Sequence, residues 1–563
     1  MMTDVDPLAG LDEHQRVVAT HFDGPLCVLA GAGTGKTRAI THRIAYGISS
    51  GRYQPDQVLA LTFTTKAAAE MGNRLQALGV QGVAARTFHS AALRQLQHFW
   101  PEITGGQLPD IVPSKARVIA RALESLKISL DTAVLRDIAG DIEWRKVHGY
   151  SLDEYRHHRA QRAGALPGGL SLEVMASIHE RYEVVKDELS RIDFEDVLLA
   201  CVGMLEEERR VLDRIRAQYS VFLVDEYQDV SPIQQRLLDA WLGDREDIVV
   251  VGDASQTIYT FAGATSSYLL SFQDRYERGS VVSLAKNYRS SEHIVAAANH
   301  VMVGRPGALV LEAQSGGGHA IGRHIAASDQ REAEFVASSI SALIKEGRDP
   351  DDIAILTRFG AQSLALETAL RLRGVNLRVQ GAKGFFDQPH VQRAVMEIRA
   401  AAVSGVSGEV TRVVDDILLG IGFDGVAPDH HGAERSKYED LLALANLARS
   451  VDKDMTIAAF SDMLAKRKGA GDAPSPGAIT LSTVHSAKGR EWPVVFMVGL
   501  SEGLFPISYA NTESAIEEER RLFYVGITRA RERLTLSMAE RAKEGGPRRE
   551  MSRFVTSLGD AAK

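Results

Sequence analysis

The sequence predicts an α/β protein built on parallel sheets. The first observation behind this prediction is a series of short apolar runs that each end in polar or glycine-rich residues: Cys27–Ala30, Val58–Leu61, Val221–Val224 and Ile248–Val251. Continuous rather than alternating apolarity is typical of strands buried on both faces, as in a parallel sheet. The second observation is the helical pattern between such runs, as in Thr37–Ile48, where isoleucines recur every four residues.

A later series of apolar runs predicts a second α/β domain. It comprises Val281–Leu284, Ile353–Leu356, Ile479–Leu481 and Val494–Val498. A chain of 563 residues is also too long for one core, because single cores stop growing near roughly 250–300 residues. The fold class is therefore α/β with two parallel sheets in separate domains.

Two long segments without comparable strand runs interrupt these series, and we interpret both as mostly helical insertions. We expect the first domain at 1–95 and 191–283 with its insertion at 96–190, and the second domain at 284–385 and 478–563 with its insertion at 386–477. The second insertion ends in the basic, glycine- and proline-containing stretch Lys466–Gly477, which is typical of a flexible joint.

Composition narrows the class of protein. The net charge of −8 argues against a general polyanion-coating protein, although local clusters decide nucleic-acid contacts. Cys27 and Cys201 are the only cysteines, which excludes a disulfide framework and a four-cysteine zinc site, and we expect both to be buried, inert thiols. Two pairs of adjacent histidines, His157–His158 and His430–His431, lack the spacing of metal ligands, and we expect them to lie on the surface. With no long apolar stretch and no signal-peptide pattern, we expect no membrane association and a cytoplasmic protein.

A glycine-rich stretch between a strand and a helix has the pattern of a phosphate-binding P-loop. It runs through Ala30, Gly31, Ala32, Gly33, Thr34, Gly35, Lys36 and Thr37. Backbone N–H groups of such a loop surround phosphate oxygens, while Lys36 would neutralise the β- and γ-phosphates and the Thr37 hydroxyl would bind Mg²⁺. Ala30 stands where the motif has its first glycine, and an ordinary glycine-rich turn is the alternative.

The strand Val221–Val224 delivers two acids, Asp225 and Glu226. An acidic pair after a buried strand is what a P-loop requires, with Asp225 holding Mg²⁺ and Glu226 orienting and deprotonating the attacking water. A surface acidic pair would not normally follow four buried residues. The two motifs together predict hydrolysis of a nucleoside triphosphate.

Further polar and aromatic residues follow other predicted strands. Gln256, Tyr259 and Phe261 come soon after the run that ends at Val251, where a glutamine suits a phosphate or water contact and an exposed aromatic suits base stacking. Core packing is the alternative for Phe261. Arg289 and Arg529 are candidate cations for the γ-phosphate, although each alone is more often a solvated or salt-bridged arginine.

In their order along the chain, the motifs resemble those of the UvrD/Rep/PcrA family of superfamily-one DNA helicases, across nearly the whole sequence. Besides the P-loop, the matching segments are Leu11–Gln15, Thr62–Ala68, Thr87–Ser90, Asp225–Asp229, Thr483–Gly489 and Glu518–Ala530. The resemblance implies two RecA-like domains that use ATP and Mg²⁺. Single-stranded DNA would cross both domains, and motion along it would usually run 3′ to 5′. The Gly252–Gly263 segment looks closest to an actinobacterial branch.

The resemblance also assigns residue roles. For the nucleotide it implies that Gln15 reads adenine, Arg38 packs beside the base, Tyr288 stacks on it and Glu491 reaches the ribose, while Gln256, Arg289 and Arg529 contact the γ-phosphate. For DNA it implies contacts from Phe63, Thr87, Phe88, His89, Tyr259, Phe261, His485 and Lys488. His89 and His485 could instead be structural histidines.

Two departures leave the activity open between alternatives. Many family members have Trp-Arg where this chain has Phe261-Ala262, and the second insertion is short for the family. The first hypothesis is an ATP-dependent helicase that acts at single-strand/duplex junctions in repair or replication. The alternative is a single-strand translocase that remodels bound proteins and unwinds poorly without a repair-protein partner.

Overall fold

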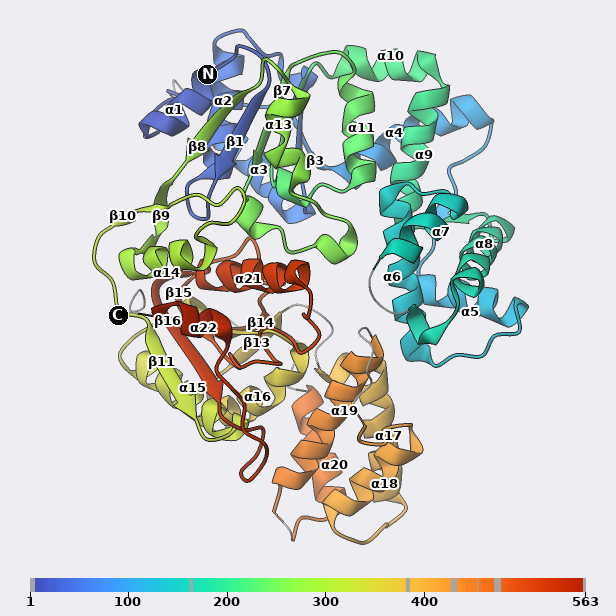
Figure 1. Ribbon diagram of the computed structural model, residues 1–563, viewed down its shortest axis with the longest axis vertical. Coiled ribbons are helices and arrows are strands. Elements are labelled where there is room, and N and C mark those ends of the chain that lie inside the picture. The colour runs from blue at the N-terminus through green and yellow to red at the C-terminus, as the bar shows by residue number, and fades with distance from the viewer. Residues whose placement is uncertain are drawn as a thin grey trace. The chain divides into compact units, whose positions relative to one another are not determined.

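The computed structural model describes residues 6–162, 166–380, 385–426, 433–452, 454–469 and 477–559 (Figure 1). The chain forms two compact units, Met1–Tyr288 with Val303–Glu312, and Arg289–Met302 with Ala313–Lys563. Each unit contains one six-stranded parallel sheet, which confirms the predicted α/β class.

The sheet of the first unit has the strand order β3-β2-β6-β7-β1-β8. Its strands are β1 (Leu26–Ala30), β2 (Val58–Thr62), β3 (Ala84–Thr87), β6 (Val221–Val224), β7 (Ile248–Gly252) and β8 (Ser280–Leu284). Neighbouring strands pair in parallel, so all carboxyl ends lie along one edge. The run Val281–Leu284 therefore belongs to this sheet, as the partner of β1, and its assignment to the second series of strands was wrong.

Helices cover both faces of this sheet. They are α1 (Glu13–Thr20), α2 (Lys36–Ser49), α3 (Thr65–Ala77), α4 (Phe88–Thr104), α9 (Phe194–Glu207), α10 (Arg209–Gln218), α11 (Pro232–Leu242), α12 (Ser267–Leu270) and α13 (Phe272–Arg275). Successive residues of β1 alternate between two cores: Cys27 packs with Val197 of α9 and Leu237 of α11, whereas Val28 packs with Ile40 of α2. Burial on both faces explains the continuous apolar strands.

The first insertion consists of α5 (Lys115–Ser125), α6 (Thr132–His148), α7 (Leu152–Gln161) and α8 (Leu172–Glu188), with the short strands β4 (Asp110–Ile111) and β5 (Arg191–Ile192). Ile119, Ile138 and Ile178 lie in its own apolar core.

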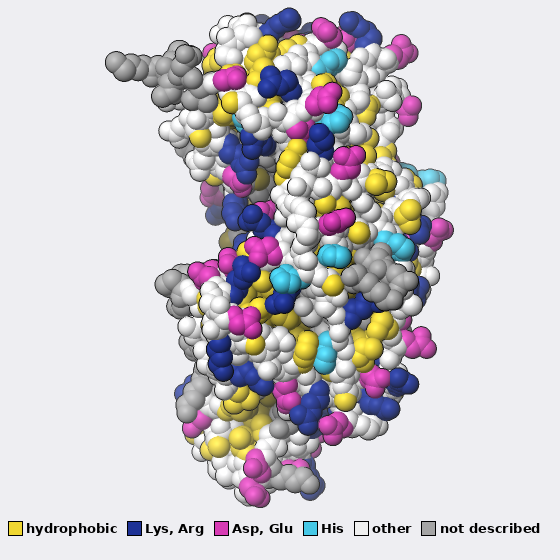
Figure 2. All heavy atoms as spheres, turned by 90° about the vertical axis from the view of Figure 1, so that its left-hand side faces the viewer, with side chains coloured by type: hydrophobic (Ala, Val, Ile, Leu, Met, Phe, Trp, Pro, Cys, Tyr) yellow, Lys and Arg dark blue, Asp and Glu magenta, His cyan; other side chains and the backbone are white. Residues whose placement is uncertain are grey.

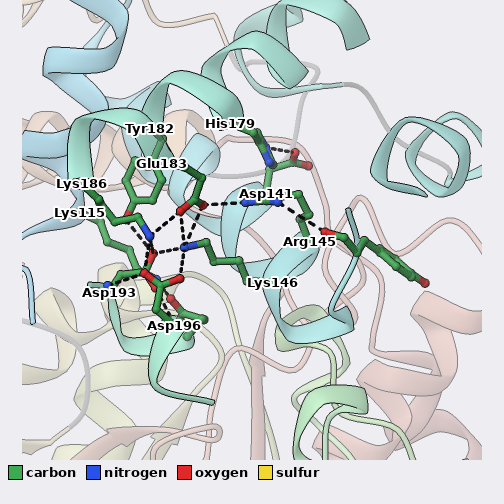
Figure 3. Close-up of polar contacts among 12 residues, drawn as sticks. Lys115, Asp141, Arg145, Lys146, His179, Tyr182, Glu183, Lys186, Asp193 and Asp196 are labelled. Carbon is green, nitrogen blue, oxygen red and sulfur yellow. Dashed lines mark hydrogen bonds and ion pairs between the residues drawn. The ribbon is translucent and has the colours of Figure 1, made fainter. Parts of the chain in front are cut away.

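A buried network of charges joins this insertion to α9 (Figure 3). The Lys146 ammonium of α6 lies 2.7 Å from both Asp193 and Asp196 and 2.9 Å from Glu183 of α8. Lys186 of α8 also pairs with Glu183, Asp193 and Asp196. Asp193 is the N-cap of α9, so the network fixes the helix that leads from the insertion back into the first sheet.

The sheet of the second unit has the order β11-β16-β15-β12-β14-β13 and is parallel throughout. Its strands are β11 (Gly322–Ala326), β12 (Ile353–Thr357), β13 (Leu377–Gln380), β14 (Ile479–Thr483), β15 (Trp492–Met497) and β16 (Ala530–Ala539). The helices of this unit outside its insertion are α14 (Glu292–Met302), α15 (Asp329–Lys345), α16 (Ser363–Arg371), α21 (Glu513–Ile527) and α22 (Arg553–Ser557). Strands β9 (Lys286–Ser291) and β10 (Glu312–Ser315) pair where the chain passes from one unit to the other.

The second insertion is formed by α17 (Pro389–Val403), α18 (Val410–Gly420), α19 (Ala433–Ser450) and α20 (Ile457–Gly469). Val391, Val414, Leu444 and Phe460 meet in its core. Residues 470–476, His430–His431 and the side chains of Lys466–Lys468 lie outside what the structure describes.

Cys27 and Cys201 are both buried, as expected. Burial raises the pKa of the Cys27 thiol to about 12 and raises that of Cys201 as well. Within the described ranges, no helix is long and apolar enough to cross a membrane. Figure 2 shows Lys and Arg side chains interspersed with Asp and Glu on the face it draws, in keeping with the net charge of −8.

Candidate functional site

The predicted site residues of the first unit gather along one edge of its sheet. The P-loop follows β1, Asp225 follows β6, the Gln256 segment follows β7, Phe63 follows β2 and Thr87 ends β3. Because these strands are parallel, their carboxyl ends share this edge, where α/β sheets bind ligands.

The P-loop leads directly into α2, which begins at Lys36. Gly33 and Gly35 adopt left-handed backbone angles, with φ of 71° and 81°, that other residues rarely adopt. Ala30 is the last residue of β1, and its side chain is buried in the core between the sheet and α2. Alanine in place of the motif's first glycine is therefore accommodated as an ordinary strand residue.

The hydroxyl of Thr37 donates a 2.9 Å hydrogen bond to the Asp225 carboxylate. Burial and the charge of Glu226 raise the pKa of Asp225 to about 6, while Lys36 opposes that rise. A hydroxyl beside a buried carboxylate is an oxygen donor pair that suits Mg²⁺. Glu226 has a φ of 54° and accepts a hydrogen bond from the Gln228 amide.

Gln256 is buried just after β7, the strand that pairs with β6. Its amide donates a 2.7 Å hydrogen bond to Asp253, at the end of β7. The structure thus places Gln256 on the same sheet edge as Lys36 and Asp225.

The predicted adenine residues meet at the P-loop. The Gln15 amide donates to the Thr34 carbonyl at 2.9 Å, and the Arg38 guanidinium donates to the Gly10 carbonyl at 2.9 Å. Tyr288 is exposed, and its hydroxyl donates to Asp12 at 2.6 Å. These contacts position an exposed aromatic ring and a buried amide next to the phosphate loop.

An aromatic cluster lies on the same edge. Phe63 stacks on Tyr259 with ring centroids 5.2 Å apart, and Tyr259 contacts Phe261 edge-on at 6.2 Å. Phe261 is 60% exposed, which excludes the core-packing alternative. The exposed Phe63 and Phe261 rings are suited to stacking on DNA bases whatever the base sequence.

The segment that begins at Thr87 requires one correction. Thr87 is the N-cap of α4, and the Phe88 ring is only 4% exposed and stacks on Trp241 in the core. Phe88 is therefore a core residue and cannot stack on a base in this conformation. His89 stacks on Phe194 at 3.9 Å, and burial with the nearby Lys115 charge lowers the pKa of His89 to about 4.

The predicted residues of the second unit lie near the amino ends of β15 and β16 and the carboxyl end of β14. Arg289 forms an ion pair with Glu491 and donates to the Thr528 carbonyl at 3.3 Å. Arg529 is buried and donates to the carbonyls of Val525 and Arg490.

His485 and Lys488 follow β14. Burial lowers the pKa of His485 to about 3, and the charges of Arg358 and Lys488 contribute to this shift. The ring is therefore neutral at physiological pH. Among the described residues, no group of three or more His, Cys, Asp and Glu is arranged to hold a metal ion.

The sequence patterns did not indicate two residues that the structure places at the site, Phe194 and Asn287. Phe194 is 51% exposed although it begins a helix, and only its contact with His89 distinguishes it from other helix-start residues. Asn287 is fully buried and bonds to the P-loop, yet in the sequence it is one amide beside two more conspicuous residues.

Comparison with known proteins agrees with this arrangement. The model of the UvrD/REP helicase N-terminal domain matches residues 11–277, and that of the UvrD-like helicase C-terminal domain matches residues 282–427 and 427–541. The chain is 41% identical to the ATP-dependent DNA helicase UvrD2 of Mycobacterium tuberculosis (strain ATCC 25618 / H37Rv), over 98% of this chain and 82% of the relative.

More distant relatives match over a similar share. The ATP-dependent DNA helicase PcrA of Bacillus subtilis (strain 168) is 29% identical over 98% of this chain and 86% of its own length. DNA helicase II of Escherichia coli (strain K12) is 29% identical over 98% and 88%.

Proposed function

The chain belongs to the UvrD/REP helicase family, and from this premise we propose that it moves 3′ to 5′ on single-stranded DNA and separates duplex DNA in repair or replication. It is an ATP-dependent DNA helicase of the UvrD/PcrA type. One observation carries the proposal: the P-loop, Asp225 and the aromatic cluster with its exposed Phe261 follow strands of a single parallel sheet. We also propose that the protein acts in the cytoplasm, as expected from the sequence.

In this proposal the first unit binds ATP and hydrolyses it to ADP and phosphate. Lys36 and the N–H groups of the P-loop would hold the β- and γ-phosphates, and Thr37 with Asp225 would hold Mg²⁺. Bound Mg²⁺ would neutralise phosphate charge. Glu226, whose carboxylate is oriented by Gln228, positions and deprotonates the attacking water.

For Gln256, Arg289 and Arg529 we propose the role that the family resemblance implies, contact with the γ-phosphate. For each arginine, contact with phosphate would replace an interaction present here: the Glu491 ion pair for Arg289 and backbone carbonyls for Arg529. Glu491, released from Arg289, would be available to the ribose.

DNA contact in the first unit is proposed for Phe63, Tyr259 and Phe261, and also for Thr87, His89 and Phe194. In the second unit it is proposed for His485 and Lys488. Base stacking on an aromatic ring contributes about 1–3 kcal/mol per base. Only two residues separate Gln256 from Tyr259, so a change at the γ-phosphate can alter the grip on DNA directly.

The Lys36→Ala substitution tests this proposal. Hydrolysis should fall by roughly 100- to 1,000-fold, because a cation aimed at the developing phosphate charge is lost. Lys345→Ala, an exposed lysine on α15, is the matched control and should retain wild-type turnover. Appreciable DNA-stimulated hydrolysis by Lys36→Ala would refute the assignment of the P-loop.

A single-strand translocase remains the second candidate, because the second insertion is a compact bundle of four described helices within 389–469. A forked duplex separates the two functions. Helicase activity predicts ATP-dependent strand separation by the protein alone, whereas a translocase would need a repair-protein partner to open the same fork.

A further inference from the structure

Four backbone carbonyls of the P-loop accept hydrogen bonds from three places in the chain: the loop itself, β9 and α1. A phosphate loop works by turning its N–H groups toward the ligand, which turns its carbonyls outward and leaves them in need of hydrogen bonds. The structure supplies them in order: Thr34 Oγ1 to the Gly31 carbonyl at 2.9 Å, Asn287 Nδ2 to that of Ala32 at 2.7 Å, Tyr288 N–H to that of Gly33 at 2.9 Å, and Gln15 Nε2 to that of Thr34 at 2.9 Å.

Among the three side chains that donate these hydrogen bonds, only Asn287 has no predicted contact with the nucleotide. It lies on β9 and is 0% exposed, so its amide does not exchange this bond for water. Its partner carbonyl belongs to the peptide that joins Ala32 to Gly33. Gly33 has a φ of 71°, and a peptide next to a glycine rotates more easily than others.

The same region of the chain also touches the start of the loop. Leu311, just before β10, is buried against Gly31, where an added Cβ would lie 2.2 Å from the leucine Cδ2. The loop therefore has an apolar contact at Gly31 and polar contacts at Ala32 and Gly33, all from the segments around β9 and β10.

We infer that Asn287 is a positioning residue for the P-loop, which holds the Ala32 carbonyl away from the phosphate and thereby keeps the Gly33 N–H turned toward it. Without the Asn287 amide, the Ala32–Gly33 peptide can rotate. Rotation would aim a carbonyl dipole at the phosphate oxygens and remove one N–H donor. The inference rests on the proposed function of this loop as the ATP site, and it concerns nucleotide affinity rather than DNA.

The test is a fluorescence titration of the full chain with the N-methylanthraniloyl derivative of ADP, which requires neither hydrolysis nor DNA. Asn287→Ala should raise the Kd roughly five- to tenfold, the range expected for one hydrogen bond that orients a loop. In steady-state hydrolysis, the KM for ATP should rise by a similar factor, with a smaller change in kcat.

Asn287→Asp keeps the shape of the side chain but replaces the donor by an acceptor. At pH 8 its Kd for the ADP derivative should exceed that of Asn287→Ala, because a carboxylate then faces the Ala32 carbonyl. At pH 6 a buried carboxyl that has taken up a proton can donate again, so the Kd of Asn287→Asp should fall below that of Asn287→Ala. This reversal is a readout that simple destabilisation does not produce.

Gln95→Met provides the matched control. Gln95 is another buried amide of the first unit, whose Oε1 accepts from Trp241 Nε1 at 2.9 Å, in the core rather than at the P-loop. Its substitution should lower stability and leave the Kd for the ADP derivative within twofold of wild type.

Either of two results would overturn the inference: wild-type affinity in Asn287→Ala, or an equal loss of affinity in Asn287→Ala and Gln95→Met. Failure of the wild-type chain to bind the ADP derivative would instead contradict the proposed function itself, and the positioning role with it.

Discussion

The charged network between the first insertion and α9 leads to a prediction for Lys146→Met. The Lys146 side chain is 1% exposed, and it lies 2.7 Å from Asp193 and from Asp196. Burial alone would lower the pKa of Lys146, but the charges of Asp193, Glu183 and Asp196 raise it above its ordinary value. The substitution fills a similar volume but removes the positive charge.

The expected loss of stability follows from the carboxylates that lose Lys146 as their partner. Lys186 still pairs with Glu183 and Asp196, but its distance to the fully buried Asp193 is 3.7 Å, so Asp193 loses its closest cation. Removal of one partner from a buried ion pair costs about 3–5 kcal/mol, because the remaining charge stays buried. Amide hydrogen exchange in α6 and α8 should then accelerate at least roughly a hundredfold.

Hydrogen exchange measured by mass spectrometry on peptides from α6 and α8 is the assay, since it reports the stability of this segment alone. Arg156→Met is the control, because Arg156 pairs with the exposed Asp153 and its loss should cost less than about 0.5 kcal/mol. Adding Asp193→Asn to Lys146→Met should restore part of the protection, since asparagine keeps the N-cap. A loss of stability below about 1 kcal/mol, or no recovery in the double variant, would show that Lys146 does not compensate the charge of Asp193.

Three further predictions concern other parts of the chain. Burial raises the pKa of Glu332 to about 7 from 4.5, so between these pH values the folded protein holds a proton that the unfolded chain has lost. The free energy of unfolding should therefore fall by roughly 3 kcal/mol as pH rises from 4.5 to 7. The Glu332→Gln variant should show a flatter dependence of the melting temperature on pH in this range. Phe261→Ala should weaken binding of a single-stranded oligonucleotide by about 1–3 kcal/mol while basal ATP hydrolysis stays unchanged, and an equal loss of both would count against a stacking role. Phe88→Ala should lower the unfolding free energy by about 3–5 kcal/mol because Phe88 packs in the core, and a stable variant deficient only in DNA binding would contradict that placement.

Local patterns made the P-loop and its acids predictable. The glycine spacing before Lys36 indicates a phosphate loop, and the apolar strand before Asp225 indicates its acidic partner, each within a few residues of sequence. In the structure, the hydroxyl of Thr37 joins the loop to Asp225. The α/β class was predictable for the same reason, because strands buried on both faces give continuous apolar runs.

Long-range pairing was not predictable from these patterns. The run at β8 looks the same whether it pairs with β1 or with a strand of the second sheet, and only tertiary structure decides. Phe88 sits in a motif that suggested DNA contact, but the direction of its ring is set by Trp241, far away in the sequence. The roles of Phe194 and Asn287 likewise depend on partners at His89 and Ala32 that no local pattern indicates.

In the proposed function, one sheet edge couples ATP hydrolysis to the binding of single-stranded DNA. The most direct test is steady-state ATP hydrolysis with and without a single-stranded oligonucleotide, at two salt concentrations. We expect strong stimulation of hydrolysis by the oligonucleotide that weakens as salt rises, because phosphate contacts release counterions. Hydrolysis that proceeds at the same rate with and without DNA would contradict it.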